Sequence, residues 1–167
     1  RKDLCNWTPW IVSNVMFSAR CLLDDPLPVY RRACGMLDAY LRCIPADGGC
    51  DEGAAYWNMA AGSLLDCLEL MAEAGLNCWD EPKLRNMLRF PLLMSLGNGY
   101  FANFADCDAR PVMYGERLQR AGELLRDAAL TAMGQNLRGQ PTDCIGDVPH
   151  FSRLLQRLFH PVGAGQP

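Results

Sequence analysis

Residues 54–74 read AAYWNMAAGSLLDCLELMAEA, and this stretch decides the fold. Its charged residues are Asp66, Glu69 and Glu73, whose spacing of three and four places them on one narrow face of a helix. The rest of the helix circumference is apolar, and such a helix is enclosed by other helices. We therefore expect a central helix over 54–74, with the ring of Tyr56 pointing into the assembly from the first turn.

Helical spacing of apolar residues continues on both sides of this stretch. A helix should begin at Thr8, with Pro9 in its first turn, and its inward side is expected to carry Ile11, Val15, Ala19 and Leu22. A second helix follows Pro28 and ends before Pro45. Further helices are expected from about 80 or 81 to before 97, with Pro91 kinking or interrupting the helix, and at about 116–125, 128–138 and 151–158. The segment 97–106, GNGYFANFAD, is rich in turn residues and should be non-helical.

Short connections between successive helices favour antiparallel helical hairpins in an all-α protein. The hairpins could stack as a bundle or as part of a curved double layer, and no short sequence repeat decides between them. We expect one helical domain over 1–160 and a flexible tail over 161–167.

The composition excludes several classes of partner. Sixteen basic and nineteen acidic residues give a net charge of -3, without a basic block that could follow a nucleic-acid backbone. No apolar run reaches the roughly 20 residues of a membrane span, and the first residues lack the apolar core of a signal peptide. We therefore expect neither a nucleic acid nor a membrane as partner.

The nine cysteines form no CxxC pair, and the chain has only two histidines, His150 and His160. We expect no metal and no cofactor, and we interpret the cysteines as reduced thiols, most of them in the core. Reduced cysteines favour the cytoplasm, although a periplasmic location stays open if an export signal precedes this sequence.

Two motifs combine polar groups with aromatic rings. The first is NWTPWIVSN, residues 6–14, and the second is DGGCDEGAAYW, residues 47–57. An asparagine amide can hold a carboxylate by hydrogen bonding, and a tyrosine can transfer protons where its pKa is lowered. The candidate site residues in these motifs are Asn6, Trp7, Trp10, Asn14, Glu52, Tyr56 and Trp57. The tryptophans could equally be core residues, and Asn6 could simply cap its helix.

These motifs, followed by LLDCLELM and GYFANFAD, resemble the heparinase II/III-like family of polysaccharide lyases over most of residues 5–107. The resemblance implies an incomplete α/α toroid followed by β-sandwich domains, with an acidic polysaccharide bound in the cleft between them. This chain has no strand-rich segment, so we expect it to be part of a longer protein or a truncated relative. An exposed edge of the toroid would suit pairing with a second copy.

The family resemblance also implies roles for individual residues. Asn6 falls at the place that neutralises the uronate carboxylate, Tyr56 at the acid/base place and Glu52 at a supporting place. Trp7 and Trp57 stand where the lyases often have histidines. Together with Trp10 and Asn14, they are expected to contact the substrate.

Three functions follow as hypotheses. The first is part of a lyase that cleaves a uronate-containing polysaccharide by β-elimination, in which a neutral amide stabilises the enolate-like charge. The second is a non-catalytic carbohydrate-binding or structural helical module. The third, ranked last, is a glycosidase with two carboxylates from Asp51, Glu52, Asp106 and Asp108.

Overall fold

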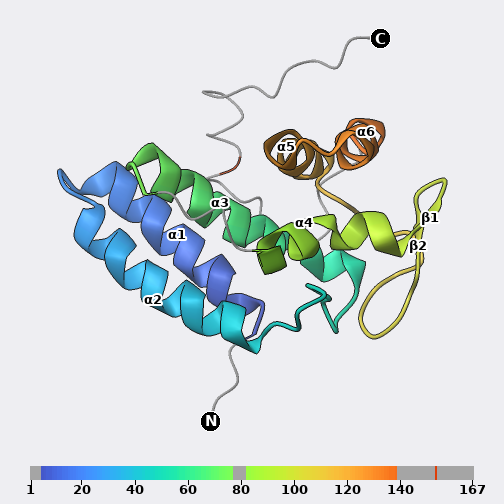
Figure 1. Ribbon diagram of the computed structural model, residues 1–167, viewed down its shortest axis with the longest axis horizontal. Helices are drawn as coiled ribbons and strands as arrows, with labels where there is room; N and C mark the ends of the chain where they lie inside the picture. The colour runs from blue at the N-terminus through green and yellow to red at the C-terminus, as the bar shows by residue number, and fades with distance from the viewer. Residues whose placement is uncertain (1–4, 77–81, 139–152, 154–167) are drawn as a thin grey trace.

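A computed structural model describes residues 5–76, 82–138 and 153 of the chain. The elements in chain order are α1 (Trp7–Leu22), α2 (Leu27–Cys43), the 3₁₀ helix η1 (Ala54–Asn58), α3 (Ala61–Glu73), α4 (Pro82–Met94), β1 (Ser95–Gly97), β2 (Tyr100–Phe101), α5 (Gly115–Leu125) and α6 (Ala128–Asn136). Helices dominate the described part of the chain (Figure 1), so the prediction of an all-α protein is confirmed.

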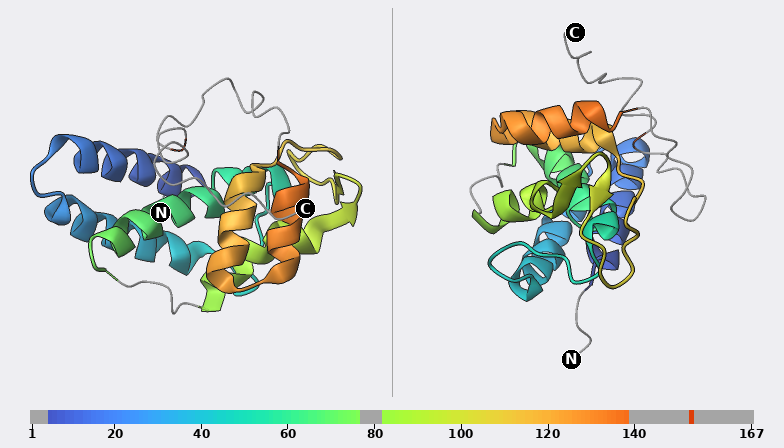
Figure 2. Two further views of the ribbon diagram at one scale, coloured as in Figure 1. Left: turned by 90° about the horizontal axis from the view of Figure 1, so that it is seen from above. Right: turned by 90° about the vertical axis from the view of Figure 1, so that its right-hand side faces the viewer.

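Two antiparallel hairpins lie at opposite ends of the molecule. The α1–α2 hairpin packs along α3, and the α5–α6 hairpin lies across α4 at the other end (Figures 1 and 2). The core runs between them and is formed chiefly by α2, α3 and α4. Its largest fully buried side chains include Trp57, Tyr30, Tyr40, Met16, Leu64, Leu65, Met71, Leu84 and Leu88.

The predicted inward side of α1 is wrong. Asn6, and not Thr8, occupies the N-cap position, and the buried residues of this helix are Pro9, Val12, Ser13, Met16 and Ala19. Of the four residues expected inside, only Ala19 is buried, while Ile11, Val15 and Leu22 are exposed. Apolar residues occur on more than one side of α1, so spacing alone could not decide which side meets α2 and α3.

The predicted central helix is present, but it is divided into η1 and α3. Helical geometry is interrupted at Ala60, whose ψ is −91°. The buried side chain of Asn58 stabilises the chain just before this break. Its Nδ2 donates to the Val112 carbonyl at 3.1 Å, and its Oδ1 accepts from the Tyr114 amide at 3.1 Å. The expected enclosure is confirmed for α3, where ten residues from Ala61 to Met71 are buried.

The segment after α4 is non-helical, as its glycines and asparagines predict. Ser95 pairs with Phe101 in a two-stranded antiparallel hairpin, and Gly97, Asn98 and Gly99 all have positive φ angles at its turn. The strand pairing itself was not expected. Pro91 lies inside α4 and does not end the helix, which continues to Met94.

Several expectations lie outside the described residues. They are the helix around 151–158, apart from Arg153, the tail over 161–167, both histidines and two of the cysteines, Cys78 and Cys144. Within the described part, no helix is long and apolar enough to cross a membrane. All seven described cysteines are free thiols. Cys67 and Cys107 are buried and Cys34 and Cys50 pack against the core, whereas the expected core position is wrong for the exposed Cys5, Cys21 and Cys43.

Candidate functional site

A cavity of about 770 Å³ lies where the beginning of α1, the end of α2, the loop over 45–53 and one side of α4 meet. Its polar lining consists of Asn6, Tyr40, Asp47, Asp51 and Glu52, together with the thiol residues Cys5, Cys43 and Cys50. Its larger apolar lining residues are Ile44, Trp57, Met87, Phe90, Met94 and Phe104. The cavity therefore combines carboxylates with apolar and aromatic side chains, a composition typical of small-molecule sites.

Asn6 and Glu52 meet at this cavity. The Nδ2 of Asn6 donates a hydrogen bond to a carboxylate oxygen of Glu52, across 46 positions of sequence. Although Asn6 stands at the N-cap of α1, its side chain does not cap the helix. The first motif and the second motif are thus joined by a hydrogen bond between two of the individual candidate residues.

Two close backbone contacts set the position of the loop that carries Glu52. Gly48 has a φ of +74°, and a Cβ there would lie 2.3 Å from the Met87 amide nitrogen of α4. Gly53 has a φ of +92°, and a Cβ there would lie 2.3 Å from the Cβ of Cys107. Only glycine fits both the backbone conformation and the space at these positions. The glycines of the second motif therefore hold the loop against α4 and against the segment around Cys107.

The electrostatic environment of the cavity is acidic. Burial raises the pKa of the Glu52 carboxyl, Asp51 and Asp106 raise it further, and the hydrogen bond from Asn6 opposes them. Burial likewise raises the pKa of the Cys50 thiol to about 11 and moves the pKa of the Tyr40 phenol well above its ordinary value. The described lining residues include no lysine, arginine or histidine.

Tyr56 and Trp57 occupy different environments in η1. Tyr56 is half-buried and is not among the residues that line the cavity. Trp57 is only 1% exposed, and its Nε1 donates to the Met87 carbonyl at 3.0 Å. The indole also forms part of the cavity lining, so the expected substrate contact by Trp57 stays a prediction.

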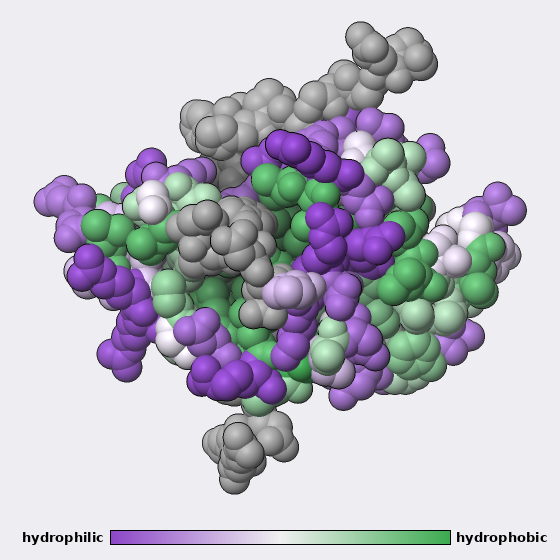
Figure 3. Space-filling view, viewed as in Figure 1, coloured by the Kyte–Doolittle hydropathy of each residue, from purple (hydrophilic) through white to green (hydrophobic). Residues whose placement is uncertain are grey.

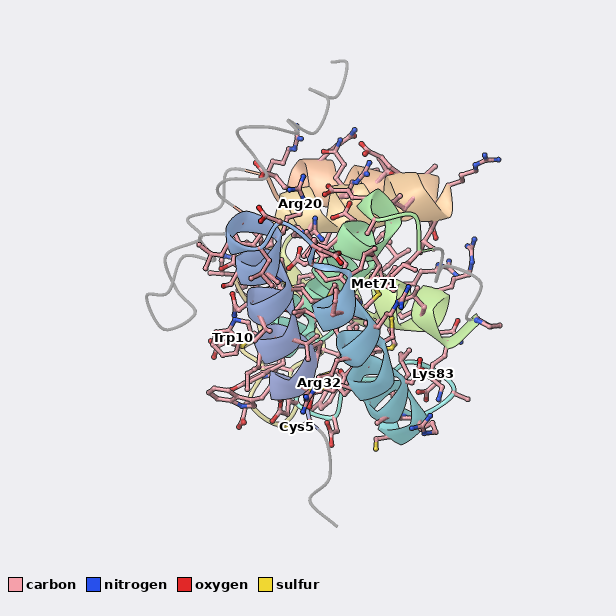
Figure 4. All side chains as sticks on the ribbon, turned by 90° about the vertical axis from the view of Figure 1, so that its left-hand side faces the viewer. Cys5, Trp10, Arg20, Arg32, Met71 and Lys83 are labelled. Carbon is pink, nitrogen blue, oxygen red and sulfur yellow. The ribbon has the colours of Figure 1, made fainter. Side chains whose placement is uncertain are left out.

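The remaining residues of the first motif lie on α1. The rings of Trp7 and Trp10 pack against each other, with centroids 5.1 Å apart and an angle of 44° between their planes. Trp7 is 56% exposed and directly follows Asn6, whereas Asn14 is exposed and donates to the Trp10 carbonyl at 3.0 Å. Figure 4 shows Cys5 at the beginning of α1, Arg20 near its end and Trp10 between them. Trp7 therefore lies next to a cavity residue, while Asn14 lies one turn beyond Trp10.

Only two of the four carboxylates named in the glycosidase hypothesis line the cavity. Asp51 and Glu52 both line the cavity, and Asp106 acts on the pKa of Glu52, but Asp106 and Asp108 are not among the lining residues. Adjacent residues such as Asp51 and Glu52 do not face each other across a substrate. Within the described ranges, no three histidine, cysteine or acidic side chains are grouped so that they could hold a metal ion.

Sequence reasoning missed Tyr40 as a cavity residue. It was expected only on the inward side of the second helix, and it is buried there. The phenol also lines the cavity beside the loop residues. Its position in the sequence could have indicated this role. Tyr40 lies near the end of α2, and the loop that carries Glu52 follows directly.

A second polar cluster is buried between α3 and α5. Asp66 pairs with Arg117 at 2.5 Å and with Arg153 at 2.8 Å, while Glu69 pairs with Arg117 at 2.8 Å and with Arg120 at 2.6 Å. Arg153 also donates to the Asn58 carbonyl at 2.9 Å and to the hydroxyl of Ser63 at 3.2 Å. The charged face of the central helix thus meets arginines, and the cluster stabilises the contact between helices.

No protein-family model and no curated protein matches this chain.

Proposed function

We propose that this chain is part of the helical domain of a polysaccharide lyase and that its cavity is the saccharide-binding cleft. The observation that carries the proposal is the hydrogen bond between Asn6 and Glu52 at the cavity wall. The two residues come from the two motifs that resemble the heparinase II/III-like family, and the resemblance implies a site role for each of them.

In this proposal, Asn6 neutralises the uronate carboxylate of the substrate. One hydrogen of its Nδ2 is engaged by Glu52, and the second hydrogen of the amide can donate to the substrate carboxylate. An amide that donates to the uronate then stabilises the negative charge that develops when the neighbouring C5 proton leaves.

Tyr56 performs the proton transfers of the proposed reaction. Its deprotonated oxygen takes the proton from C5, the bond between C4 and the glycosidic oxygen breaks, and the leaving oxygen receives the proton from the tyrosine. The products are an unsaturated uronate and a new sugar end. Tyr56 follows Glu52 by four residues and is half-buried.

The exposed side of α1 supports the proposal of a toroid. Trp7, Ile11, Val15 and Leu22 are large apolar residues on the outside of this helix, and all are more than half exposed. In a toroid, the next helical hairpin would cover such a face, and in an oligomer a second copy would cover it. Both arrangements belong to the longer protein that the family resemblance implies.

The test is an ultraviolet absorbance assay for unsaturated uronate products, with a panel of uronate-containing polysaccharides as substrates. The chain should produce an absorbance increase that Tyr56→Phe and Asn6→Ala both abolish. Tyr100→Phe is the matched control, since Tyr100 is a partly exposed tyrosine on β2 that does not line the cavity. Equal rates for Tyr56→Phe and the wild-type chain would contradict the assignment of Tyr56.

A non-catalytic carbohydrate-binding module is the second candidate. It is favoured by the absence of Tyr56 from the cavity lining, where the described residues also include no base of the histidine type. Such a module would bind oligosaccharides without releasing unsaturated products. Saccharide binding by calorimetry, with no absorbance change from either this chain or a longer parent chain, would select it.

A further inference from the structure

Hydrogen-bond acceptors dominate the polar lining of the cavity. Asp47, Asp51 and Glu52 contribute three carboxyl groups, and an ionised carboxylate accepts hydrogen bonds but donates none. Asn6 adds a further acceptor. The residue is only 8% exposed, and its Oδ1 is buried without a hydrogen-bond partner among the described residues. A buried acceptor without a partner is costly, and a ligand that donates a hydrogen bond would satisfy it.

Strong donors are scarce in the same lining. Among the described lining residues there is no lysine, arginine or histidine, and the Nε1 of Trp57 already donates to the Met87 carbonyl. Of the two amide hydrogens of Asn6, one is engaged by Glu52 and the other serves the uronate carboxylate in the proposed function. The phenol of Tyr40 and weakly donating thiols are the other side-chain donors of the described lining. A second acceptor-only group on the ligand would therefore find few partners.

The apolar part of the lining offers such a group no alternative. Phe90, Met94 and Phe104 provide a surface for the carbon-bound hydrogens of a sugar ring. A charged substituent placed against these side chains would lose water without gaining a hydrogen bond. The polar and the apolar parts of the lining therefore favour the same kind of ligand, one whose substituents are mainly donors.

We propose that this cavity selects uronate saccharides whose hydroxyl groups are free and rejects those whose hydroxyls carry sulfate esters. The inference rests on the proposed function, because it assumes that Asn6 holds one uronate carboxylate. A free hydroxyl can donate to Asn6 Oδ1 or to a carboxylate oxygen of Asp47 or Asp51. A sulfate ester has only acceptor oxygens, so it leaves the protein acceptor unpaired. A site built to accept from a substrate hydroxyl rejects the analogue without that hydroxyl for this reason.

The test measures binding by calorimetry on the full chain with Tyr56→Phe, which does not cleave the substrate under the proposed function. Two ligands are hexasaccharides of alternating glucuronate and N-acetylgalactosamine, one unsulfated and one with a sulfate ester on each N-acetylgalactosamine. The third is a neutral glucose hexasaccharide, which has free hydroxyls but no carboxylate. The unsulfated uronate hexasaccharide should bind about tenfold more tightly than the sulfated one, and more tightly than the neutral one. The preference over the sulfated ligand should persist at high salt, because hydrogen bonds and not long-range charge carry it.

Two further variants, made in the same Tyr56→Phe chain, locate the selection. Asp51→Asn replaces a carboxylate of the cavity by an amide that can donate to a sulfate oxygen, so the difference between the two uronate hexasaccharides should shrink. Asp38→Asn makes the same change on the exposed side of α2, outside the cavity, and should leave the difference unchanged. Thermal unfolding of both variants verifies that neither has lost its fold.

The unfavourable outcomes are distinguishable. Equal or tighter binding of the sulfated hexasaccharide, or a preference that disappears at high salt, overturns the selection of free hydroxyls while the saccharide cleft stands. Binding of the neutral hexasaccharide as tightly as the unsulfated uronate one removes the carboxylate role of Asn6, so the proposed function and the inference that rests on it both fall. An absence of binding by all three ligands overturns the saccharide cleft and the selection together.

Discussion

Arg153 and Asp66 form a buried ion pair, with 2.8 Å between Nε and Oδ2, although 87 positions of sequence separate them. The same carboxylate pairs with Arg117 of α5. Asp66 therefore joins three parts of the chain at one point inside the protein. Because two guanidinium groups depend on one carboxylate, the loss of that carboxylate should cost more than the loss of a surface charge.

We expect Asp66→Asn to lower the free energy of unfolding by about 3–5 kcal/mol, since it leaves the buried guanidinium of Arg153 without its carboxylate partner, while Arg117 keeps its pair with Glu69. Urea unfolding measures the loss. Glu73→Gln is the control, because Glu73 and Arg20 are exposed and 3.9 Å apart, and such pairs contribute under about 1 kcal/mol. Similar small losses in both variants would contradict the structural role of the cluster.

The second prediction concerns the pH dependence of stability at Glu69. Burial raises the pKa of this carboxyl, but Arg117 and Arg120 outweigh burial and hold the pKa below its usual value. A carboxyl with a lowered pKa in the folded state stabilises the protein above its unfolded-state pKa of about 4.3, and this contribution is lost as the pH falls through the folded-state pKa.

The prediction is tested by measuring the midpoint of urea unfolding at several pH values, from neutral pH down to about pH 3. The lowest pH lies just under the ordinary pKa of a carboxyl group. Glu69→Gln should have a lower midpoint at neutral pH and a smaller decrease on acidification than the wild type. An identical pH profile for variant and wild type would show that Glu69 does not carry the effect.

The third prediction compares two glycines. Gly48→Ala would place a methyl group against the α4 backbone at a position with positive φ, and the backbone strain alone costs about 1–3 kcal/mol. Gly35→Ala lies inside α2 with no atom within 4 Å of the new Cβ, so it should stabilise the protein by roughly 0.5–1 kcal/mol. Thermal unfolding should therefore change in opposite directions, and a shift of equal sign would refute the proposed close contact.

The fourth prediction separates two tryptophans. Trp57→Phe removes the donor to the Met87 carbonyl and should cost about 1–3 kcal/mol. Trp7→Phe changes an exposed ring and should stay within about 0.5 kcal/mol of the wild type. Chemical denaturation of the two variants provides the comparison. A stable Trp57→Phe variant would mean that the buried indole is not required for packing.

The helical class of the fold could be predicted from sequence, because the enclosed helix that contains Asp66 and Glu69 is apolar on nearly all other sides. The orientation of α1 could not. Val12 and Val15 are equally apolar, and only packing against α2 and α3 decides that Val12 is buried and Val15 exposed. The interruption at Ala60 was also out of reach, because it depends on Asn58 and its bonds to residues more than fifty positions away.

The cavity lining includes Asn6 and Glu52, two of the candidate residues named from the sequence, and their role in a site stays a prediction. Trp57 belongs to the second motif as well, but its neighbour across the core, Met87, comes from α4 and could not be inferred from local sequence. Asp47, Asp51 and Glu52 stand together in the second motif, but only the folded structure shows that they line a cavity. The surface shows a further feature that the sequence did not predict. Apolar side chains gather towards the end that carries the β1–β2 hairpin (Figure 3), where Leu93, Leu96 and Tyr100 are exposed.

The contacts between α4 and the cavity loop over 45–53 bear on the kinetics of ligand binding. Besides the close approach of Gly48 to Met87, the Asn86 side chain donates to the Ala46 carbonyl at 2.9 Å and Trp57 donates to the Met87 carbonyl. A loop held at several points is less free to move independently of α4. We therefore expect a ligand to bind the cavity in a single encounter step, whose observed rate rises in proportion to ligand concentration and does not level off at a slow opening of the protein.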